Sequence, residues 1–131
     1  ELTPEGWALL LSNDDVIGFT NQLVSDGSLL MAYQKGRDKS AMRSSFLVDF
    51  AGLKFLAHNS TGNSLVFASK DVPETGHDAL MSFAFNGTKW TVSMYHASHR
   101  KDLDLSQIAI KHGGGGHRGA CGFTTAKLPF V

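Results

Sequence analysis

Residues 80–95 read LMSFAFNGTKWTVSMY, and this stretch indicates the fold class of the chain. Apolar and polar residues alternate on both sides of Asn86-Gly87, the pair preferred in a two-residue type I′ turn. The pattern predicts a β-hairpin in which Phe85 opposes Thr88, Phe83 opposes Trp90 and Met81 opposes Val92. These residues, together with Met94, are predicted to form the buried face. The other face is predicted to be polar and carries Ser82, Lys89, Thr91, Ser93 and Tyr95.

An earlier hairpin is predicted from the same periodicity. Phe46, Val48 and Phe50 alternate with other residues, Ala51-Gly52 makes a turn, and Leu53, Phe55 and Ala57 alternate again. The segment from Ser64 to Val72 fits either a strand or a short helix, and periodicity does not decide between them.

The first third of the chain is predicted to be helical. Thr3-Pro4 is a helix start, with a hydroxyl cap followed by a proline that tolerates the first turn. Asn13 is expected to cap a second helix, and a third is expected over about residues 26–42. The residues expected to share one face of the second helix are Val16, Phe19, Leu23 and Val24. Those expected to point inward from the third are Leu29, Leu30, Tyr33 and Ala41.

A short helix is predicted after the second hairpin. Asp104 is its expected cap, Gln107 completes a capping box, Leu103 packs on Ile108, and Gly113 ends the helix. The elements together predict an α+β fold: a mixed β-sheet with flanking helices and an N-terminal helical segment. The simplest organisation is one domain over residues 1–131, with a helical connector to about residue 44 and the sheet and glycine-rich motif over about 45–131.

The amino-acid composition is that of a globular domain with balanced charge. The 131 residues are 42% hydrophobic and 18% charged, as in soluble globular domains, and twelve acids balance twelve bases. A net charge of zero argues against strong unspecific binding to polyanions. Five bases and two acids lie between Lys89 and Arg118, so an anionic ligand is expected on the C-terminal half. The single cysteine, Cys121, and the lack of a long apolar run or a signal-like start favour a cytoplasmic location.

The most unusual stretch is GGGGHRGACG at residues 113–122. Four consecutive glycines lose much backbone entropy on folding, so their presence suggests that backbone N–H groups must approach a guest such as phosphate. A helix beginning near Gly116 would add its N-terminal dipole to this site. His117 and Arg118 would then donate hydrogen bonds to the anion.

The glycine run is also compatible with several different roles. It could be a flexible connector, because glycine clusters commonly mark loops. A dinucleotide-binding fingerprint fits Gly114, Gly116 and Gly119, but a helix precedes the run and no acidic residue follows it. A Walker loop would need Lys-Ser/Thr where Ala120-Cys121 stand. A metal site would need His96, His99, His117 and Cys121 to meet, although their spacing matches no known zinc module. Cys121 alone could simply be a small buried packing residue.

Residues 113–122 closely resemble the G-G-G-G-H-[RK]-x-A-[AS]-G signature of the DHH-associated domain, type one. In that domain Ala or Ser usually stands where this chain has Cys121. Weaker similarities extend upstream: residues 92–95 resemble a V-S-L-R/Y strand, 104–109 a D-V-S-x-I-A helix, and 76–79 a turn before the hairpin. The resemblance covers most of the chain from about Asp26. This domain also occurs in RecJ-type exonucleases, and Tyr95 stands where these RecJ-like members often have Arg. It is either a stacking platform for a base or an ordinary cross-strand tyrosine.

The resemblance implies that the domain follows a catalytic DHH domain, which is absent from this chain and whose Asp and His residues bind two metal ions, typically manganese. This chain has no Asp-His-His triplet. The chain is therefore expected to recognise substrate, to contain no catalytic residue, metal ligand or cofactor, and to hydrolyse no phosphate ester. Its expected ligand is the phosphate of a short single-stranded RNA or DNA oligonucleotide. The expected contacts are Gly113, Gly114, Gly115, Gly116, His117, Arg118, Ser93, Tyr95, His96 and Arg100.

Two other hypotheses belong to different classes. The same glycine site could recognise a nucleotide or a cyclic dinucleotide. Alternatively, the N-terminal helices could dock on the catalytic DHH domain of the same protein or on a second copy of the chain. In each case the parent is expected to be a metal-dependent phosphoesterase or exonuclease.

Overall fold

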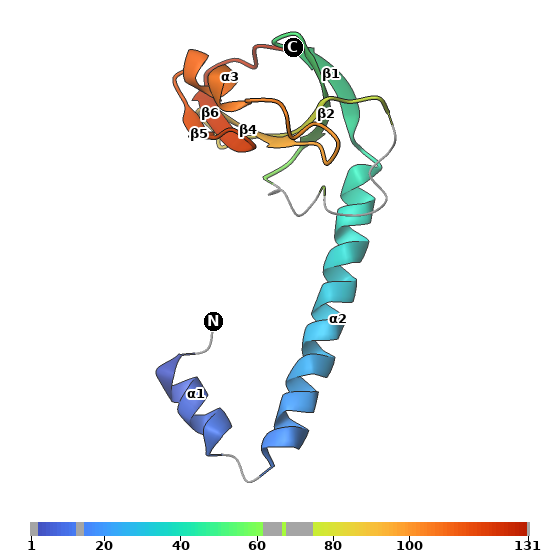
Figure 1. Ribbon diagram of the computed structural model, residues 1–131, viewed down its shortest axis with the longest axis vertical. Coiled ribbons are helices and arrows are strands. Elements are labelled where there is room, and N and C mark those ends of the chain that lie inside the picture. Colours follow the sequence, from blue (N-terminus) through green and yellow to red (C-terminus); the bar gives the residue numbers. More distant parts are fainter. Residues whose placement is uncertain (1–2, 13–14, 62–66, 68–74, 131) are drawn as a thin grey trace. The chain divides into compact units, whose positions relative to one another are not determined.

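The computed structural model describes residues 3–12, 15–61, 67 and 75–130 (Figure 1). The chain divides into two compact units, residues 1–37 and 38–131. None of the helices in the described ranges is both long and apolar enough to cross a membrane.

The first unit is helical, as expected. Helix α1 spans Pro4–Leu11, and its Thr3 cap is confirmed, because the Thr3 hydroxyl accepts a hydrogen bond of 3.2 Å from the Gly6 N–H. Helix α2 begins at Val16, and the Asp15 carboxylate accepts a hydrogen bond of 2.9 Å from the Gly18 N–H. The expected cap, Asn13, lies outside the described residues.

The division of the following segment into two helices is wrong, because α2 runs uninterrupted over Val16–Met42. Asp26 does not start a new helix. Its carboxylate accepts a hydrogen bond of 2.8 Å from the side chain of Gln22, one turn earlier, and such a pair stabilises a continuous helix. Gly27 lies within the helix, at the usual cost of about 1 kcal/mol relative to alanine.

The inward orientation expected for the third helix is also wrong. Leu29 and Leu30 are each 69% exposed and Tyr33 is 67% exposed, while Ala41 is half-buried. Of the face expected on the second helix, Val16, Leu23 and Val24 are exposed, and Phe19 is half-buried. The spacing of apolar residues locates the apolar sides of a helix, but it does not show whether anything within the same chain covers them.

The second unit is a sheet of six described strands in the order β1-β2-β3-β4-β6-β5. Strands β2 and β3 are parallel, and every other neighbouring pair is antiparallel, so the sheet is mixed and the α+β fold class is confirmed. The strands are β1 (Phe46–Phe50), β2 (Leu53–Asn59), β3 (Ala79–Phe85), β4 (Trp90–His96), β5 (Gly115–His117) and β6 (Ala120–Thr125).

The first hairpin forms as predicted. Phe50 pairs with Leu53 across a two-residue turn, and both turn residues have positive φ, 52° at Ala51 and 79° at Gly52. These values are typical of a type I′ turn, whose twist matches that of the flanking strands.

The second hairpin forms with a different register. Phe85 pairs with Trp90, Phe83 with Val92 and Met81 with Met94, so four residues separate the strands instead of two. The Asn86 side-chain oxygen accepts hydrogen bonds from the N–H groups of Thr88 and Lys89, at 3.0 and 2.9 Å. This side-chain contact competes with the tight turn and widens the loop.

A slip of two residues leaves each side chain on its predicted face, because the side-chain period of a strand is two. Met81, Phe83, Val92 and Met94 are buried as predicted, whereas Phe85 is 52% exposed. Ser82, assigned to the polar face, is only 3% exposed. That face is therefore partly covered.

Each face of the sheet has its own apolar cluster. The larger lies on the same side as α3 and includes Phe55, Met81, Val92 and Met94, with Leu105 and Ala109 from the α3 segment. The smaller, on the opposite side, consists of Met42, Leu56, Phe67 and Leu80, with Tyr95 packed against it. Apart from Phe67, the segment 64–72 that fitted either a strand or a helix lies outside the described residues.

Helix α3 spans Ser106–Lys111. It begins slightly later than predicted, with Leu105 at the N-cap, while the Asp104 carboxylate accepts a hydrogen bond of 3.1 Å from the Ser106 N–H. The predicted end at Gly113 is confirmed. Gly113 has a φ of +75°, its N–H donates to the Ile110 carbonyl at 3.0 Å, and the Gly114 N–H donates to the Ala109 carbonyl at 2.9 Å. This pair of bonds is a Schellman motif.

Candidate functional site

Five residues form one row across the face of the sheet opposite α3. Gly115 pairs with Gly122, Gly122 with Ser93, Ser93 with Ser82, and Ser82 with His58. Residues paired across neighbouring strands point to the same side of a sheet, so these five share one face. We call them the central row. At its β5 end the row contains no side chain larger than that of serine.

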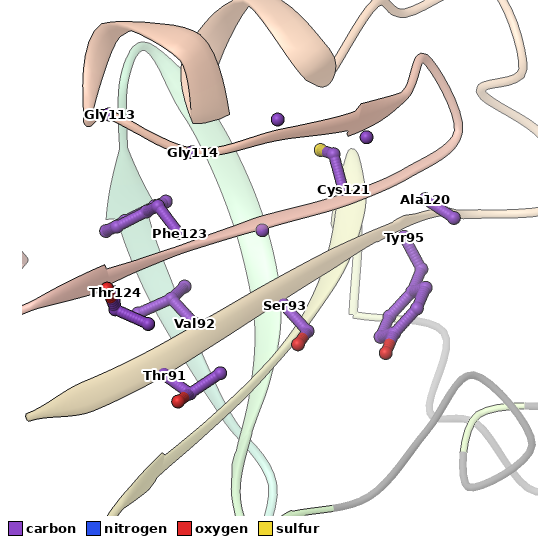
Figure 2. Close-up of a pocket in the computed structure, with 13 residues that line it drawn as sticks. Thr91, Val92, Ser93, Tyr95, Gly113, Gly114, Ala120, Cys121, Phe123 and Thr124 are labelled. Atoms are coloured by element: carbon purple, nitrogen blue, oxygen red, sulfur yellow. The ribbon is translucent and has the colours of Figure 1, made fainter.

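Two groups of side chains share the face of the central row, one group on each side of it. One consists of Tyr95, Ala120 and His117, which are paired across β4, β6 and β5. The other consists of Thr91 and Thr124, which pair across β4 and β6. Thr91, Ser93 and Tyr95 point to one side of β4 (Figure 2).

A hollow of about 510 Å³ lies over this part of the sheet (Figure 2). This volume falls in the range usual for small-ligand sites. Its lining has hydroxyl groups and glycine backbone but no formally charged residue. The lining residues are Thr91, Val92, Ser93, Tyr95, Gly113, Gly114, Gly115, Gly116, Ala120, Cys121, Gly122, Phe123 and Thr124.

Most glycines of the run are needed by the fold itself. Gly113 has the positive φ of the helix end. A Cβ on Gly114 would lie 2.1 Å from the Gly122 carbonyl oxygen, and one on Gly116 would lie 2.7 Å from the Ala120 carbonyl oxygen. Gly116 also has a φ of +132°. The helix end therefore explains Gly113, and close approach to β6 explains Gly114 and Gly116, without any ligand.

Gly115 differs from its neighbours in the run. No atom lies within 4 Å of the position that its Cβ would occupy, and its φ is outside the left-handed region. Because Gly115 pairs with Gly122 in the central row, an added side chain would extend over the hollow. The fold would accept a larger residue at this position. The hollow stays open only if the residue at position 115 has no side chain.

The helix expected to begin near Gly116 is wrong. Residues Gly115–His117 form strand β5, which pairs with β6 instead. Once the Schellman motif has ended α3, the extended backbone bonds to β6, so no helix N-terminus is present at this position. His117 and Cys121 are therefore not one helical turn apart.

Six of the ten predicted contacts line the hollow: Ser93, Tyr95 and Gly113 to Gly116. His117 pairs with Ala120 and so shares the face of Gly115, but it is not among the lining residues. Exposed Arg118 follows β5, and its guanidinium Nη2 donates to the Asp102 carbonyl at 2.8 Å. Sequence reasoning missed Gly122 and Thr124, which the alternation of β6 could have placed opposite Ser93 and Thr91.

The other two predicted contacts have partners away from the hollow. Arg100 forms ion pairs with Asp78 and with Asp102, the latter at 3.1 Å. The His96 Nε2 atom lies 2.8 Å from the Leu103 carbonyl oxygen, and a Cβ on Gly119 would lie 2.6 Å from the other ring nitrogen. These contacts join the loop after β4 to its neighbours. The structure does not bring these two residues together with the central row.

Cys121 is a buried packing residue on the opposite side of β6, within the larger apolar cluster. Burial, with the nearby Asp104 carboxylate, raises the pKa of its thiol to about 11. The thiol is therefore protonated near neutral pH. In the described part of the chain, no group of three or more His, Cys, Asp or Glu side chains could hold a metal ion.

Two buried histidines predict a pH-dependent stability. His77 is 7% exposed, and its pKa is lowered by burial and by nearby His99, although Asp78 opposes the shift. Burial also lowers the pKa of His58, which is 6% exposed. The unfolded chain, in which histidine has its ordinary pKa of about 6.5, therefore binds more protons than the folded chain just below that pH.

The free energy of unfolding is expected to fall as the pH drops from about 7 to 5. Urea denaturation at a series of pH values would measure this, and His77→Gln should flatten the dependence. His117→Gln, at an exposed position, is the control and should leave it unchanged. Loss below about pH 4 would have another cause, because the lowered pKa values of Asp102 and Asp104 act there. An equally steep loss between pH 7 and 5 in His77→Gln would contradict this assignment.

Comparison with known proteins extends the description of the fold. No family model matches the sequence, and no curated protein sequence matches it. A pGpG-specific phosphodiesterase, PggH of Vibrio cholerae, has a similar structure at a TM-score of 0.57 and 15% identity. The match covers 88% of this chain and 38% of that protein. An uncharacterised protein of Helicobacter pylori G27 matches at a TM-score of 0.44 and 19% identity, over 65% of this chain and 24% of that protein.

The chain thus spans less than two fifths of either solved protein. At 15% identity, the likeness to PggH establishes a shared fold over most of the chain, and it does not by itself establish a shared activity.

Proposed function

We propose that this chain is the substrate-recognition domain of a DHH-type phosphoesterase and that it binds the phosphate of a short single-stranded oligonucleotide over the central row. The observation that carries the proposal is Gly115, a glycine that the fold does not require and whose missing side chain leaves the hollow open. The resemblance of residues 113–122 to the DHH-associated signature, and the fold shared with a phosphodiesterase of a linear dinucleotide, support it.

The chemistry of the hollow agrees with a phosphate held by neutral groups. The hydroxyls of Thr91, Ser93, Tyr95 and Thr124 can donate hydrogen bonds to phosphate oxygens. Positive charge lies outside the lining, at Arg118. We therefore expect Arg118 to contact the part of the ligand that extends beyond the hollow. The metal-dependent chemistry of the parent enzyme would belong to the separate catalytic domain.

Arg118→Ala is expected to weaken oligonucleotide binding by about tenfold or more, because a charge-assisted hydrogen bond contributes about 1.5–3 kcal/mol. The measurement is a titration of the full chain with the single-stranded dinucleotide pApA, followed by NMR chemical shifts. Lys127→Ala removes one exposed positive charge elsewhere and serves as the control. Unchanged affinity in Arg118→Ala, with thermal unfolding as in the wild type, would remove Arg118 from the site.

A second candidate function is favoured by the first unit. Its helices expose many large apolar side chains, among them Trp7, Leu9, Ile17, Val24, Leu29, Leu30 and Met31. Such a concentration of exposed apolar surface is usual at protein contact sites. The segment would then dock on the catalytic domain or on a second copy, and the mass of the chain in solution would test the self-association.

A further inference from the structure

A second hollow adjoins the first on the same face of the sheet. Its volume is about 290 Å³, and Thr91 and Ser93 of β4 line both hollows. The first hollow lies over β4, β6 and β5, and the second lies over β4, β3 and the residues just after β2. The lining residues of the second hollow are Ser60, Thr61, Ser82, Ala84, Phe85, Asn86, Thr91 and Ser93.

The central row joins the two hollows. Gly115, Gly122 and Ser93 line the first hollow, and Ser93 and Ser82 line the second. Three inter-strand steps separate Gly115 from Ser82, which is roughly 14 Å at the usual strand spacing of about 4.8 Å. This path can hold two linked nucleosides, and it is longer than one nucleoside needs.

The second hollow differs from the first in lacking the glycine run and in having the aromatic residue Phe85 in its lining. Serine and threonine hydroxyls and one amide line it, without a charged residue and without a glycine run. Neutral donors and acceptors suit the hydroxyls of a ribose and the edges of a base. Ala84, which pairs with Thr91 on this face, leaves room above β3.

We infer that the second hollow binds the nucleoside that follows the bound phosphate, so that the ligand is a dinucleotide or a longer chain. This inference rests on the proposed function, because it extends the phosphate site over Gly115 and Ser93. The first hollow holds the phosphate together with the nucleoside to which it is attached. The neighbouring nucleoside crosses β4 and lies over Ser82 and Ala84.

Titration of the full chain with pApA, AMP and ADP, followed by NMR chemical shifts, tests the inference. ADP carries more negative charge than AMP but has no second nucleoside. It therefore separates the effect of ligand charge on affinity from the effect of a second nucleoside. We expect pApA to bind at least tenfold more tightly than either AMP or ADP. Equal affinities for the three ligands would overturn the inference, while the proposed function would stand if Gly115→Val abolished the binding of all three.

Variants in the second hollow test whether the tighter binding of pApA arises there. Ala84→Leu should reduce the affinity for pApA to that for AMP and leave AMP binding unchanged. Thr61→Leu, at an exposed position outside the strands, tests the same hollow if Ala84→Leu does not fold. Ala126→Leu, an equal enlargement at an exposed position, is the matched control. Tighter binding of pApA that survives in the folded hollow variants would overturn the inference. Wild-type binding of AMP in Gly115→Val would overturn the proposed function and the inference with it.

Discussion

Gly114→Ala is expected to destabilise the second unit by about 2–3 kcal/mol, a cost typical of overpacking. The added Cβ would lie 2.1 Å from the Gly122 carbonyl oxygen, 2.6 Å from the Phe123 Cβ and 2.7 Å from the Phe123 Cα. All three atoms belong to strand β6 or are fixed to its backbone, so no flexible side chain can move aside. Relief would require β5 to separate from β6.

The measurement is the free energy of unfolding from urea denaturation at neutral pH. Gly115→Ala is the matched control, because it makes the same substitution at the next residue, where nothing lies within 4 Å of the new Cβ. Its unfolding free energy should stay within about 0.5 kcal/mol of the wild-type value, as for most surface substitutions. Equal stability of the two variants would show that β5 and β6 do not approach as closely as described.

Gly115→Val is expected to reduce oligonucleotide affinity by at least tenfold without loss of stability. Its branched side chain would lie on the same face as Gly122 and Ser93 and would fill the hollow over the central row. Valine is favoured in strands, and the φ of Gly115 is not left-handed, so the backbone of β5 should accept it.

The effect is measured by titration with pApA, with thermal unfolding to verify the fold. Thr88→Val places a valine at an exposed turn position outside both hollows, and it should bind like the wild type. A folded Gly115→Val with wild-type affinity would reduce the glycine run to a structural connection between α3 and β6. Comparison with Gly114→Ala separates two roles. Gly114 allows close packing against β6, and Gly115 leaves the hollow open to a ligand.

Several elements could be predicted because their causes are local. The Ala51-Gly52 turn, the Thr3-Pro4 start of α1 and the Gly113 end of α3 each depend on contacts within a few residues. The register of the second hairpin could not be predicted from Asn86-Gly87 alone. The Asn86 side-chain oxygen accepts hydrogen bonds from the N–H groups of Thr88 and Lys89. This contact is equally local, but it opposes the two-residue turn that the Asn-Gly pair predicts.

The candidate site was predicted in part. Sequence reasoning identified the glycine run, Ser93 and Tyr95, which share the hollow. It expected a helix start near Gly116, whose N-terminal dipole and free N–H groups would add to a phosphate site. The run instead contains an edge strand, since β6 offers β5 a hydrogen-bonding partner. The pairing of β5 with β6, which only two residues separate in the sequence, decided this difference.

By itself, the sequence determined the alternation of β3 and β4, the apolar sides of the helices and the unusual backbone freedom of residues 113–116, because these follow from residue types at short spacing. Only the tertiary structure decided which glycines serve packing and which leaves a space. That distinction depends on whether β6 lies next to each Cβ position, as it does for Gly114 and does not for Gly115. The central row is also a tertiary feature, because five strands must pair in one register before two glycines, two serines and a histidine share a line.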